Sequence, residues 1–416
     1  MEPIPRPKRY YFIFIVGSCF LTLFMLWGMV VNSFAIFFKP IAEDMGWSRA
    51  AVSTALFTRS IGTALSAPIA GRLIDRIGAK PVMAAGTIII GIGLLGASRV
   101  TTLWQYYSIF AVIGVGLMCA TVIPCSLIIA NWFIGRRGAA MSAAFVGTSV
   151  GGMVMSPVAN WIILNYSWRA AFALNGILIL ILVAPVILLV IRDHPSDIGL
   201  EPYRNAGHGG DTAGADWGVG VREAFSLRAF WLIAAIMFII GFATNGVHTH
   251  AVAYLTDLGH SPTSSAYAWS LVMVIMVAGK LAFGPIADRW GAPKAAAADF
   301  ALYALSILAL SFARPYGIAI AFACLYGFAC GGPLTLNPLL TGGNLGMRNF
   351  GAIYGILTIM ASVGGAISPV IAGAYFDSHG TYLPVFFVFM ILMLLGAVCA
   401  IRIRPASQQP GGTRQI

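Results

Sequence analysis

The sequence predicts an all-α membrane protein with 12 transmembrane helices in two six-helix repeats, and with both termini in the cytoplasm. Three observations lead to this fold class: charge is scarce, basic residues are unevenly placed, and the chain repeats itself. Of its 416 residues, 59% are hydrophobic and 9% are charged, and the mean hydropathy is +0.86. Soluble domains are about a quarter charged. The composition therefore excludes a soluble enzyme, a nucleic-acid-binding protein and a disordered chain.

Apolar runs divide the chain into a series of candidate spans, each long enough to cross a bilayer as a helix. The first run follows a basic N-terminus but has no small-residue cleavage pattern, so we expect a retained span and not a signal peptide. All six cysteines fall inside these runs, where we expect packing roles. The runs lie near residues 11–38, 50–70, 81–98, 103–131, 139–162, 170–191, 229–255, 264–287, 295–313, 316–342, 350–376 and 383–401.

Of the 25 basic residues, Arg59 and Lys280 lie inside spans, and the others are distributed unevenly between the two sets of loops. Basic residues concentrate on the cytoplasmic side of membrane proteins, so the richer set of loops, together with both tails, is predicted to lie inside. The net charge of +11 then reflects topology and indicates no nucleic-acid partner. The inside set is Arg6, Lys8, Arg9, Arg72, Arg76, Lys80, Arg136, Arg137, Arg192, Arg204, Arg222, Arg228, Arg289, Lys294, Arg348, Arg402, Arg404 and Arg414; the outside set is Lys39, Arg49, Arg99, Arg169 and Arg314.

An internal repeat appears when the sequence is aligned with itself at a single offset, which takes Gly71 onto Gly284. One offset that holds from the first span of each half to the fifth indicates two copies of one unit. The matched pairs include Gly28 and Gly241, Asn32 and Asn245, Gly46 and Gly259, Ser48 and Ser261, Asp75 and Asp288, Arg76 and Arg289, Gly78 and Gly291, Asn131 and Asn344, and Gly151 and Gly364.

The repeat defines the predicted domains. An N-terminal half covers residues 1–191, a cytoplasmic linker rich in Gly and Asp covers 192–228, the C-terminal half covers 229–404, and a tail covers 405–416. Two parallel six-helix repeats are the plan of many alternating-access transporters, which bind substrate between the halves near the bilayer midplane. We expect a functional monomer surrounded by membrane lipid.

The loop from Gly71 to Lys80, with its copy from Gly284 to Lys294, resembles the signature between helices 2 and 3 of the major facilitator superfamily. Further stretches resemble the monocarboxylate porters and the bacterial oxalate/formate antiporters. These stretches are Gly46 to Ser48, Asn131 to Ala140, and Asp193 to Leu200. The resemblance covers essentially the whole chain and implies the major facilitator fold.

The resemblance also implies a gating role for the signature loops, whose charges hold the cytoplasmic ends of the halves closed in the family. The glycines of these loops complete the signature. The predicted gating residues are Gly71, Asp75, Arg76 and Gly78 in the first half, and Gly284, Asp288, Arg289 and Gly291 in the second.

Lys280 is the leading candidate for contact with substrate. It lies in the eighth span, about seven residues or roughly 10 Å from its cytoplasmic end. A charge within the bilayer costs several kcal/mol and marks a functional site by default, and an ammonium suits an anionic substrate. The alternative is that Lys280 extends to the inner interface. The family carries an Arg at this position, and Lys lacks the planar two-pronged geometry of guanidinium.

Proton coupling requires a titratable group. Eukaryotic monocarboxylate porters have an Asp one turn before the cation, where this chain has Met276. His248 and His250 in the seventh span are candidates because imidazole titrates near neutral pH, with polar packing as their alternative. Lys280 itself becomes titratable when desolvated.

Further polar residues within the spans are candidates for the substrate cavity. Arg59 is either a second cation of the cavity or part of an outer-gate pair with Asp44 or Glu43. Buried amides need hydrogen-bond partners, so the symmetric Asn32 and Asn245 are candidates for substrate or water contact. Tyr326 and Tyr354 offer hydroxyls to a carboxylate. Asp299 is expected to form a salt bridge with Arg289 and Lys294 at the inner surface.

These residues predict a proton-coupled symporter of small monocarboxylates such as lactate or pyruvate, in a bacterial inner membrane. The eleventh span has no second cation of the kind implied for the oxalate/formate relatives, which favours a monocarboxylate. Organic anion exchange and drug/proton antiport are the alternatives within the fold. No metal or zinc spacing and no cofactor motif is found, and no enzyme activity is predicted.

Overall fold

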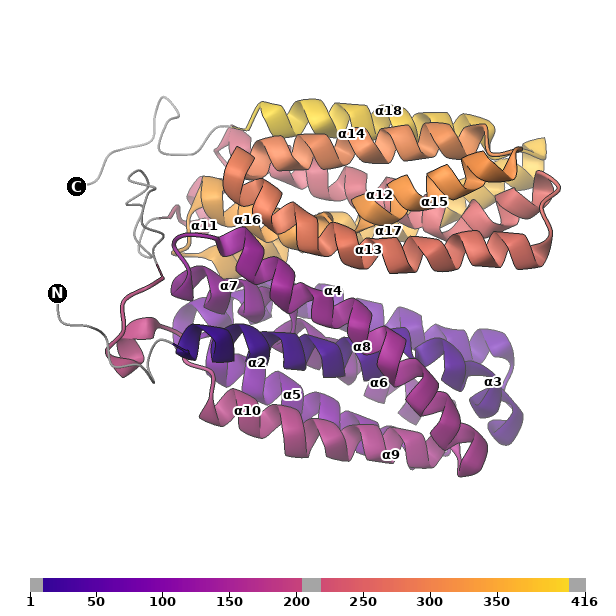
Figure 1. Ribbon diagram of the computed structural model, residues 1–416. Coiled ribbons are helices and arrows are strands. Elements are labelled where there is room, and N and C mark those ends of the chain that lie inside the picture. Colours follow the sequence, from indigo (N-terminus) through magenta and orange to yellow (C-terminus); the bar gives the residue numbers. More distant parts are fainter. Residues whose placement is uncertain (1–9, 204–217, 404–416) are drawn as a thin grey trace. The chain divides into compact units, whose positions relative to one another are not determined.

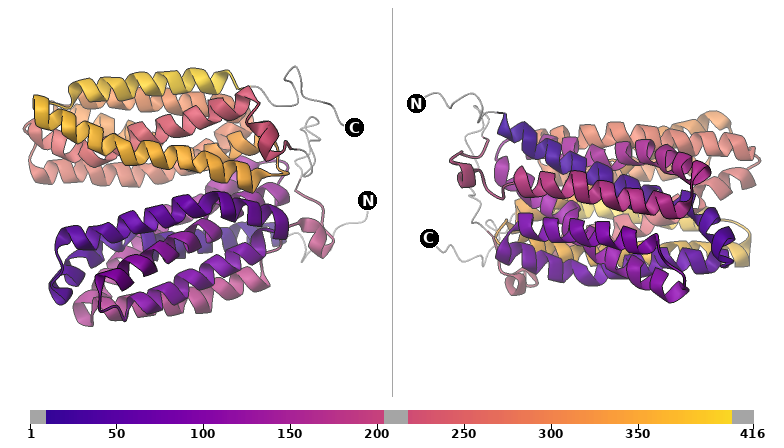
Figure 2. Two further views of the ribbon diagram at one scale, coloured as in Figure 1. Left: turned by 180° about the vertical axis from the view of Figure 1, so that it is seen from behind. Right: turned by 90° about the horizontal axis from the view of Figure 1, so that it is seen from below.

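The computed structural model describes residues 10–203 and 218–403. The predicted tail 405–416, the basic residues before Tyr10 and part of the predicted linker lie outside these ranges. Within them the regular elements are helices, with isolated bridges joining Phe133 to Tyr203 and Gly218 to Gly346. Contacts divide the chain into two compact units, Met1–Thr212 and Ala213–Ile416. Figure 1 labels the helices of each unit, and Figure 2 shows them from two further directions.

The first unit contains six membrane-crossing segments, three of which are divided into shorter helices. The first and sixth segments include a π-helical stretch, in which the hydrogen bonds join residues five apart. A short 3₁₀ helix follows the sixth. In chain order these helices are α2 Tyr11–Leu26, η1 Trp27–Asn32, α3 Phe34–Met45, α4 Arg49–Ile77, α5 Ala79–Ala97, α6 Leu103–Ala120, α7 Val122–Trp132, α8 Arg137–Asn165, α9 Trp168–Leu178, η2 Ile179–Val183, α10 Ala184–Leu189 and η3 Pro195–Ile198.

The second unit repeats this order with fewer interruptions, since only its fourth segment is divided. A short helix, α11, precedes the first crossing. In chain order the helices are α11 Val221–Ala224, α12 Arg228–Asp257, α13 Pro262–Trp290, α14 Ala292–Ser311, α15 Tyr316–Cys330, α16 Pro333–Leu345, α17 Phe350–His379 and α18 Leu383–Ile401.

Eleven helical segments of the described chain are long and apolar enough to cross a membrane. The remaining long helix is α4, whose 29 residues are sufficient in length. Arg59 and several serines and threonines lower its hydropathy below that of the others. Counting α4, the described chain has 12 membrane-crossing segments in two repeats, as the sequence predicted.

The same helix pairs pack together in both units. In the first, α2 packs on α8, α4 on α6, and α5 on α6 and α9. The corresponding pairs of the second are α12 on α17, α13 on α15, and α14 on α15 and α18. The sequence repeat is therefore also a repeat of packing, and each unit builds its core in the same way.

Several matched pairs of the sequence repeat are turn residues. Ser48 and Ser261 accept hydrogen bonds from the backbone N–H groups of Ala51 and Ser264, and thereby cap the N-termini of α4 and α13. Gly78 and Gly291, at φ of +91° and +82°, make the one-residue turns into α5 and α14. Glycine adopts this left-handed backbone without steric cost.

A second class of matched glycines lets helices cross closely. A Cβ added to Gly114 in α6 would collide with the carbonyl oxygen of Arg59 in α4. A Cβ at its repeat mate Gly327 in α15 would lie 2.6 Å from the carbonyl oxygen of Val272 in α13. Backbone contact of this kind is a common way for membrane helices to associate.

Candidate functional site

Lys280 lies well inside α13 and its side chain is only 6% exposed. The helix is held close to the end of α15 at this point, because a Cβ on Gly331 would overlap the backbone nitrogen of Lys280. The alternative position, extended to the inner interface, would leave the side chain open. The observed burial instead places it among protein groups.

A polar and aromatic cluster surrounds this crossing in the second unit. Cys330, the last residue of α15, interacts with the hydroxyls of Tyr303 and Tyr326 and electrostatically with Lys280 and Asp299. The rings of Tyr303 and Tyr326 meet edge to face at 5.6 Å between centroids. The sequence placed Cys330 among the packing residues, and its environment instead makes it the centre of this cluster.

The predicted hydroxyl donors differ in their surroundings. Tyr326 is fully buried, and its hydroxyl donates to the carbonyl oxygen of Thr244 in α12 at 3.0 Å. Tyr354 in α17 is 4% exposed and stacks on Phe350 at 5.2 Å. Tyr326 thus joins α15 to α12 in this conformation, and its predicted contact with a substrate carboxylate would replace that bond.

Asp299 does not form the salt bridge that the sequence predicted. It is 1% exposed, and its Oδ1 has no hydrogen-bond partner among the described residues. Its carboxyl group lies instead against Gly332, between α15 and α16, where an added Cβ would be 2.6 Å from the carboxyl carbon. The prediction failed because the helix phase turns Asp299 into the bundle, while Arg289 and Lys294 are exposed at the helix ends.

The two candidate histidines of α12 have different partners. His248 is exposed and meets the ring of Trp269 in α13 edge to face at 4.6 Å. His250 is half-buried, with Nε2 at 3.0 Å from the carbonyl oxygen of Pro369 in α17 and its ring 4.9 Å from that of Tyr382. His248 therefore has the more open position. The ring of Trp269 also lies 6.2 Å from that of Tyr326, so Trp269 links His248 to Tyr326.

The guanidinium of Arg59 is hydrogen-bonded to the first segment of its own unit. Its Nη1 donates to the carbonyl oxygen of Val30, in the π-helical stretch η1, at 3.0 Å. The predicted outer-gate pair is not formed, because Glu43 pairs with Lys39 at 3.7 Å and Asp44 has other partners. The hydrogen bond from Arg59 to Val30 joins α4 to the first segment of its unit.

Asn32 and Asn245 are exposed and occupy equivalent positions. Each packs against a glycine in the fifth segment of its half. Asn32 Nδ2 is 2.5 Å from a Cβ added to Gly152, and Asn245 Nδ2 is 2.7 Å from a Cβ added to Gly365. Asn32 donates to the carbonyl oxygen of Thr148 at 2.8 Å, whereas Asn245 donates to Gly241 in its own helix at 3.0 Å. The repeat preserves their placement but not their hydrogen bonds.

The predicted gating residues lie at the ends of α4 and α13. Gly71 and Gly284 are buried, Asp75 and Asp288 are half-buried, and Arg76 and Arg289 are exposed. Gly78 and Gly291 form the turns described above. Their gating role remains a prediction from the resemblance.

The loop after α10 secures the turn at Gly78. Asp193 Oδ1 accepts from the backbone nitrogen of Lys80 at 2.8 Å, in the first turn of α5. Asn131 donates to the carbonyl oxygen of Asp193 at 3.2 Å, and Trp132 donates to that of Arg192 at 2.8 Å. Burial raises the pKa of Asp193 above its ordinary value. Two stretches that carried the family resemblance are therefore bonded to each other.

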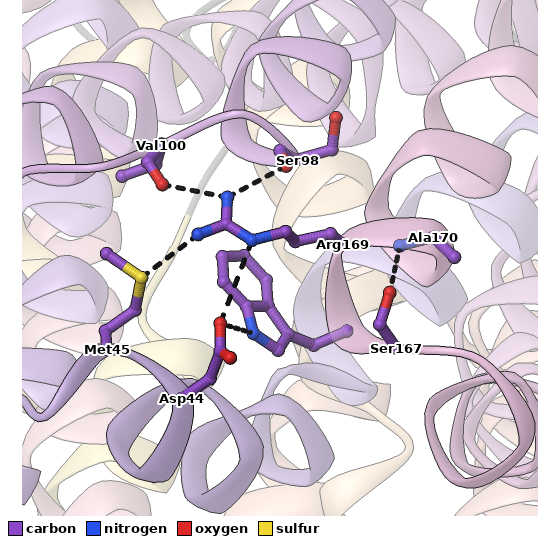
Figure 3. Close-up of polar contacts among 8 residues, drawn as sticks. Asp44, Met45, Ser98, Val100, Ser167, Arg169 and Ala170 are labelled. Atoms are coloured by element: carbon purple, nitrogen blue, oxygen red, sulfur yellow. Dashed lines mark hydrogen bonds and ion pairs between the residues drawn. The ribbon is translucent and has the colours of Figure 1, made fainter.

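Sequence reasoning did not find the cluster around Arg169, shown in Figure 3. Its guanidinium donates to the carbonyl oxygens of Ser98 and Val100 at 3.2 and 2.9 Å. It also lies 4.3 Å from the ring centroid of Trp168, whose indole nitrogen donates to Asp44 at 3.0 Å. Arg169 Nε is 3.8 Å from Asp44 Oδ2. This cluster joins the ends of α3, α5 and α9.

Comparison with known protein families decides the identity of the fold. The model of the Major Facilitator Superfamily matches residues 16–341 and 251–415. The chain belongs to this superfamily. It is a transporter and not an enzyme, and several of the matched relatives are named monocarboxylate transporters.

Relatives from animals and bacteria match over most of their length. The chain is 27% identical over 391 residues to monocarboxylate transporter 13 of Rattus norvegicus, covering 92% of this chain and 86% of the relative. It is 24% identical over 388 residues to the uncharacterized MFS-type transporter YcxA of Bacillus subtilis, covering 88% of this chain and 89% of the relative.

Solved transporter structures share the fold. A variant of the Escherichia coli fucose:proton symporter FucP superposes with a TM-score of 0.70 at 16% identity, covering 93% of this chain and 98% of that one. The human organic anion transporter MFSD10 gives 0.70 at 15% identity, covering 95% and 100%. At these identities the likeness concerns the fold alone.

Proposed function

We propose that this superfamily member carries a small monocarboxylate, of the lactate or pyruvate kind, together with a proton across a bacterial inner membrane by alternating access. The burial of Lys280 within α13 is the observation that carries the proposal. An ammonium removed from water gains from an anion placed against it. Relatives named monocarboxylate transporters support the same substrate class.

In the proposed cycle, the site opens outward and accepts the anion with a proton. Lys280 pairs with the carboxylate, and Tyr354, Tyr326, Asn245 and Asn32 are the proposed polar contacts. Pairing lowers the cost of enclosing the charge, so the loaded site can close and open inward. Arg59 is the proposed second cation only for a dianion, because its guanidinium already holds Val30.

Uptake of labelled lactate, pyruvate, formate and oxalate into proteoliposomes tests the proposal, with and without an inward-directed proton gradient. Symport predicts monocarboxylate uptake that the gradient drives. Uptake that ignores the gradient but requires a counter-anion inside would establish exchange instead. Movement of none of these anions would reject the substrate class.

Lys280→Gln is expected to abolish monocarboxylate binding and uptake, because the neutral amide cannot form an ion pair with a carboxylate. Lys280→Arg should retain uptake with an altered apparent affinity, since guanidinium keeps the charge but changes its geometry. Binding is measured as ligand-induced thermal stabilisation of the purified protein. Full stabilisation of Lys280→Gln by lactate would remove Lys280 from the site.

A further inference from the structure

Asp299 is a carboxyl group in the core of the second unit that the proposed transport cycle does not yet use. It is 1% exposed, it is two turns along α14 from the predicted cytoplasmic end, and its Oδ1 has no hydrogen-bond partner within residues 10–203 and 218–403. Burying an ionised carboxylate without compensating donors is far more costly than burying the neutral acid. This position therefore favours a bound proton.

The surroundings of Asp299 connect it to Lys280. Consecutive glycines separate α15 from α16: Gly331 contacts the backbone of Lys280 on α13, and Gly332 contacts the carboxyl group of Asp299 on α14. Cys330, the residue before them, interacts electrostatically with both side chains. Lys280 and Asp299 therefore both lie beside the break between α15 and α16.

The helices packed against α14 supply few groups that could titrate together with Asp299. On α14 itself Tyr303 interacts with it electrostatically. Helix α13 brings Lys280, and α15 brings Tyr326 and Cys330. Helix α16 has no titratable residue, and α18 has Cys399. The only other carboxyl group on these helices is that of Asp288, which is half-buried in the last turn of α13.

We propose that Asp299 is the residue that binds and releases the transported proton, and that it does so by exchanging charge with Lys280 across Gly331 and Gly332. This inference rests on the proposed symport. In the loaded carrier, the carboxylate of Asp299 has taken a proton from the outer solution and formed an O–H bond, while Lys280 pairs with the substrate anion. In the empty carrier, the proton has left to the inner solution, and the carboxylate of Asp299 balances Lys280.

The charge of the site is the same in both states, which explains why anion and proton would move together. An anion alone would add a negative charge beside an ionised Asp299, and a proton alone would leave the site with a net positive charge. Each of these states holds an uncompensated buried charge, and such charges are strongly destabilising.

Asp299→Asn tests the inference because the amide has the shape of the protonated acid but cannot release a proton. We expect gradient-driven uptake in proteoliposomes to fall to its level without a gradient, while exchange of labelled for unlabelled monocarboxylate continues at about the parent rate. The matched control is Asp377→Asn, at an exposed aspartate near the end of α17. This control should resemble the parent in both assays.

Infrared spectroscopy provides a readout besides transport. The carbonyl band of a protonated carboxylic acid should appear when lactate binds to the parent and to Asp377→Asn, and should be absent from lactate-bound Asp299→Asn. Gradient-driven uptake by Asp299→Asn, or an unchanged carbonyl band, would overturn the inference. Loss of exchange as well, in a variant with the parent's thermal stability, would also reject it. Failure of the proposed symport would differ, because the parent itself would then ignore the gradient.

Discussion

Arg169 shows how a single side chain can connect several segments, largely through backbone atoms. Its guanidinium reaches two carbonyl oxygens in the α5–α6 turn and the sulfur of Met45 at 3.1 Å. Because guanidinium has several donors in a fixed plane, it can serve these acceptors together. A lysine ammonium at the same place could reach only part of the set.

Arg169→Lys is expected to lower the free energy of unfolding by about 1.5–3 kcal/mol, the range for hydrogen bonds to a charged group. Thermal unfolding in detergent measures the loss, with Arg99→Lys as the control at an exposed arginine of the same turn. Equal stability of the two variants would show that the cluster in Figure 3 contributes little.

Sequence reasoning selected Lys280 from its charge and position, because a cation within an apolar run is visible in the sequence. It did not find the partners of Arg169, since a backbone carbonyl has no sequence signature. It also misjudged Asp299, because residues near in sequence were taken as neighbours, whereas helix phase directs the side chain inward. Charge within a span could be predicted, but side-chain direction could not.

At the scale of the elements, the repeat predicted the order of the helices and several of their ends. The observed helices extend beyond the predicted spans: α4 ends at Ile77 and α8 begins at Arg137. An apolar run ends at the first charges, but a helix continues into the interface, where charged side chains are solvated. The π-helical η1 was not predicted. The stretch from Gly28 to Gly46 has as many residues as its repeat from Gly241 to Gly259, yet the helix α12 in that repeat is regular, so the sequence repeat gives no sign of η1.

The break between α15 and α16 is the element whose geometry the proposed coupling requires. Gly332→Ala is expected to reduce gradient-driven uptake, because the new methyl group would displace the carboxyl group of Asp299. Gly343→Ala in α16 is the control, since nothing lies within 4 Å of its added Cβ. Uptake by the two variants is compared at equal protein density in proteoliposomes. Equal uptake would show that the contact with Asp299 is unimportant.

At the scale of the whole molecule, the basic residues predict that both termini and the linker lie in the cytoplasm. The prediction can be tested with single cysteines at Thr101, in the α5–α6 turn, and at Ser196, in η3. A membrane-impermeant thiol reagent added to intact cells should label Thr101→Cys and leave Ser196→Cys unlabelled until the cells are opened. The reverse pattern would invert the orientation and with it the direction assigned to the cycle.

The low hydropathy of α4 has a consequence for how the protein is made. Nascent helices partition from the insertion machinery into lipid according to their apolarity, and Arg59 weakens this preference for α4. Its hydrogen bond to Val30 and the close crossing with α6 at Gly114 are contacts that only other segments of the same unit can provide. Helix α4 should therefore leave the insertion machinery together with its neighbours. Strongly apolar helices can enter the lipid one after another, whereas the helices of the first unit are expected to insert cooperatively.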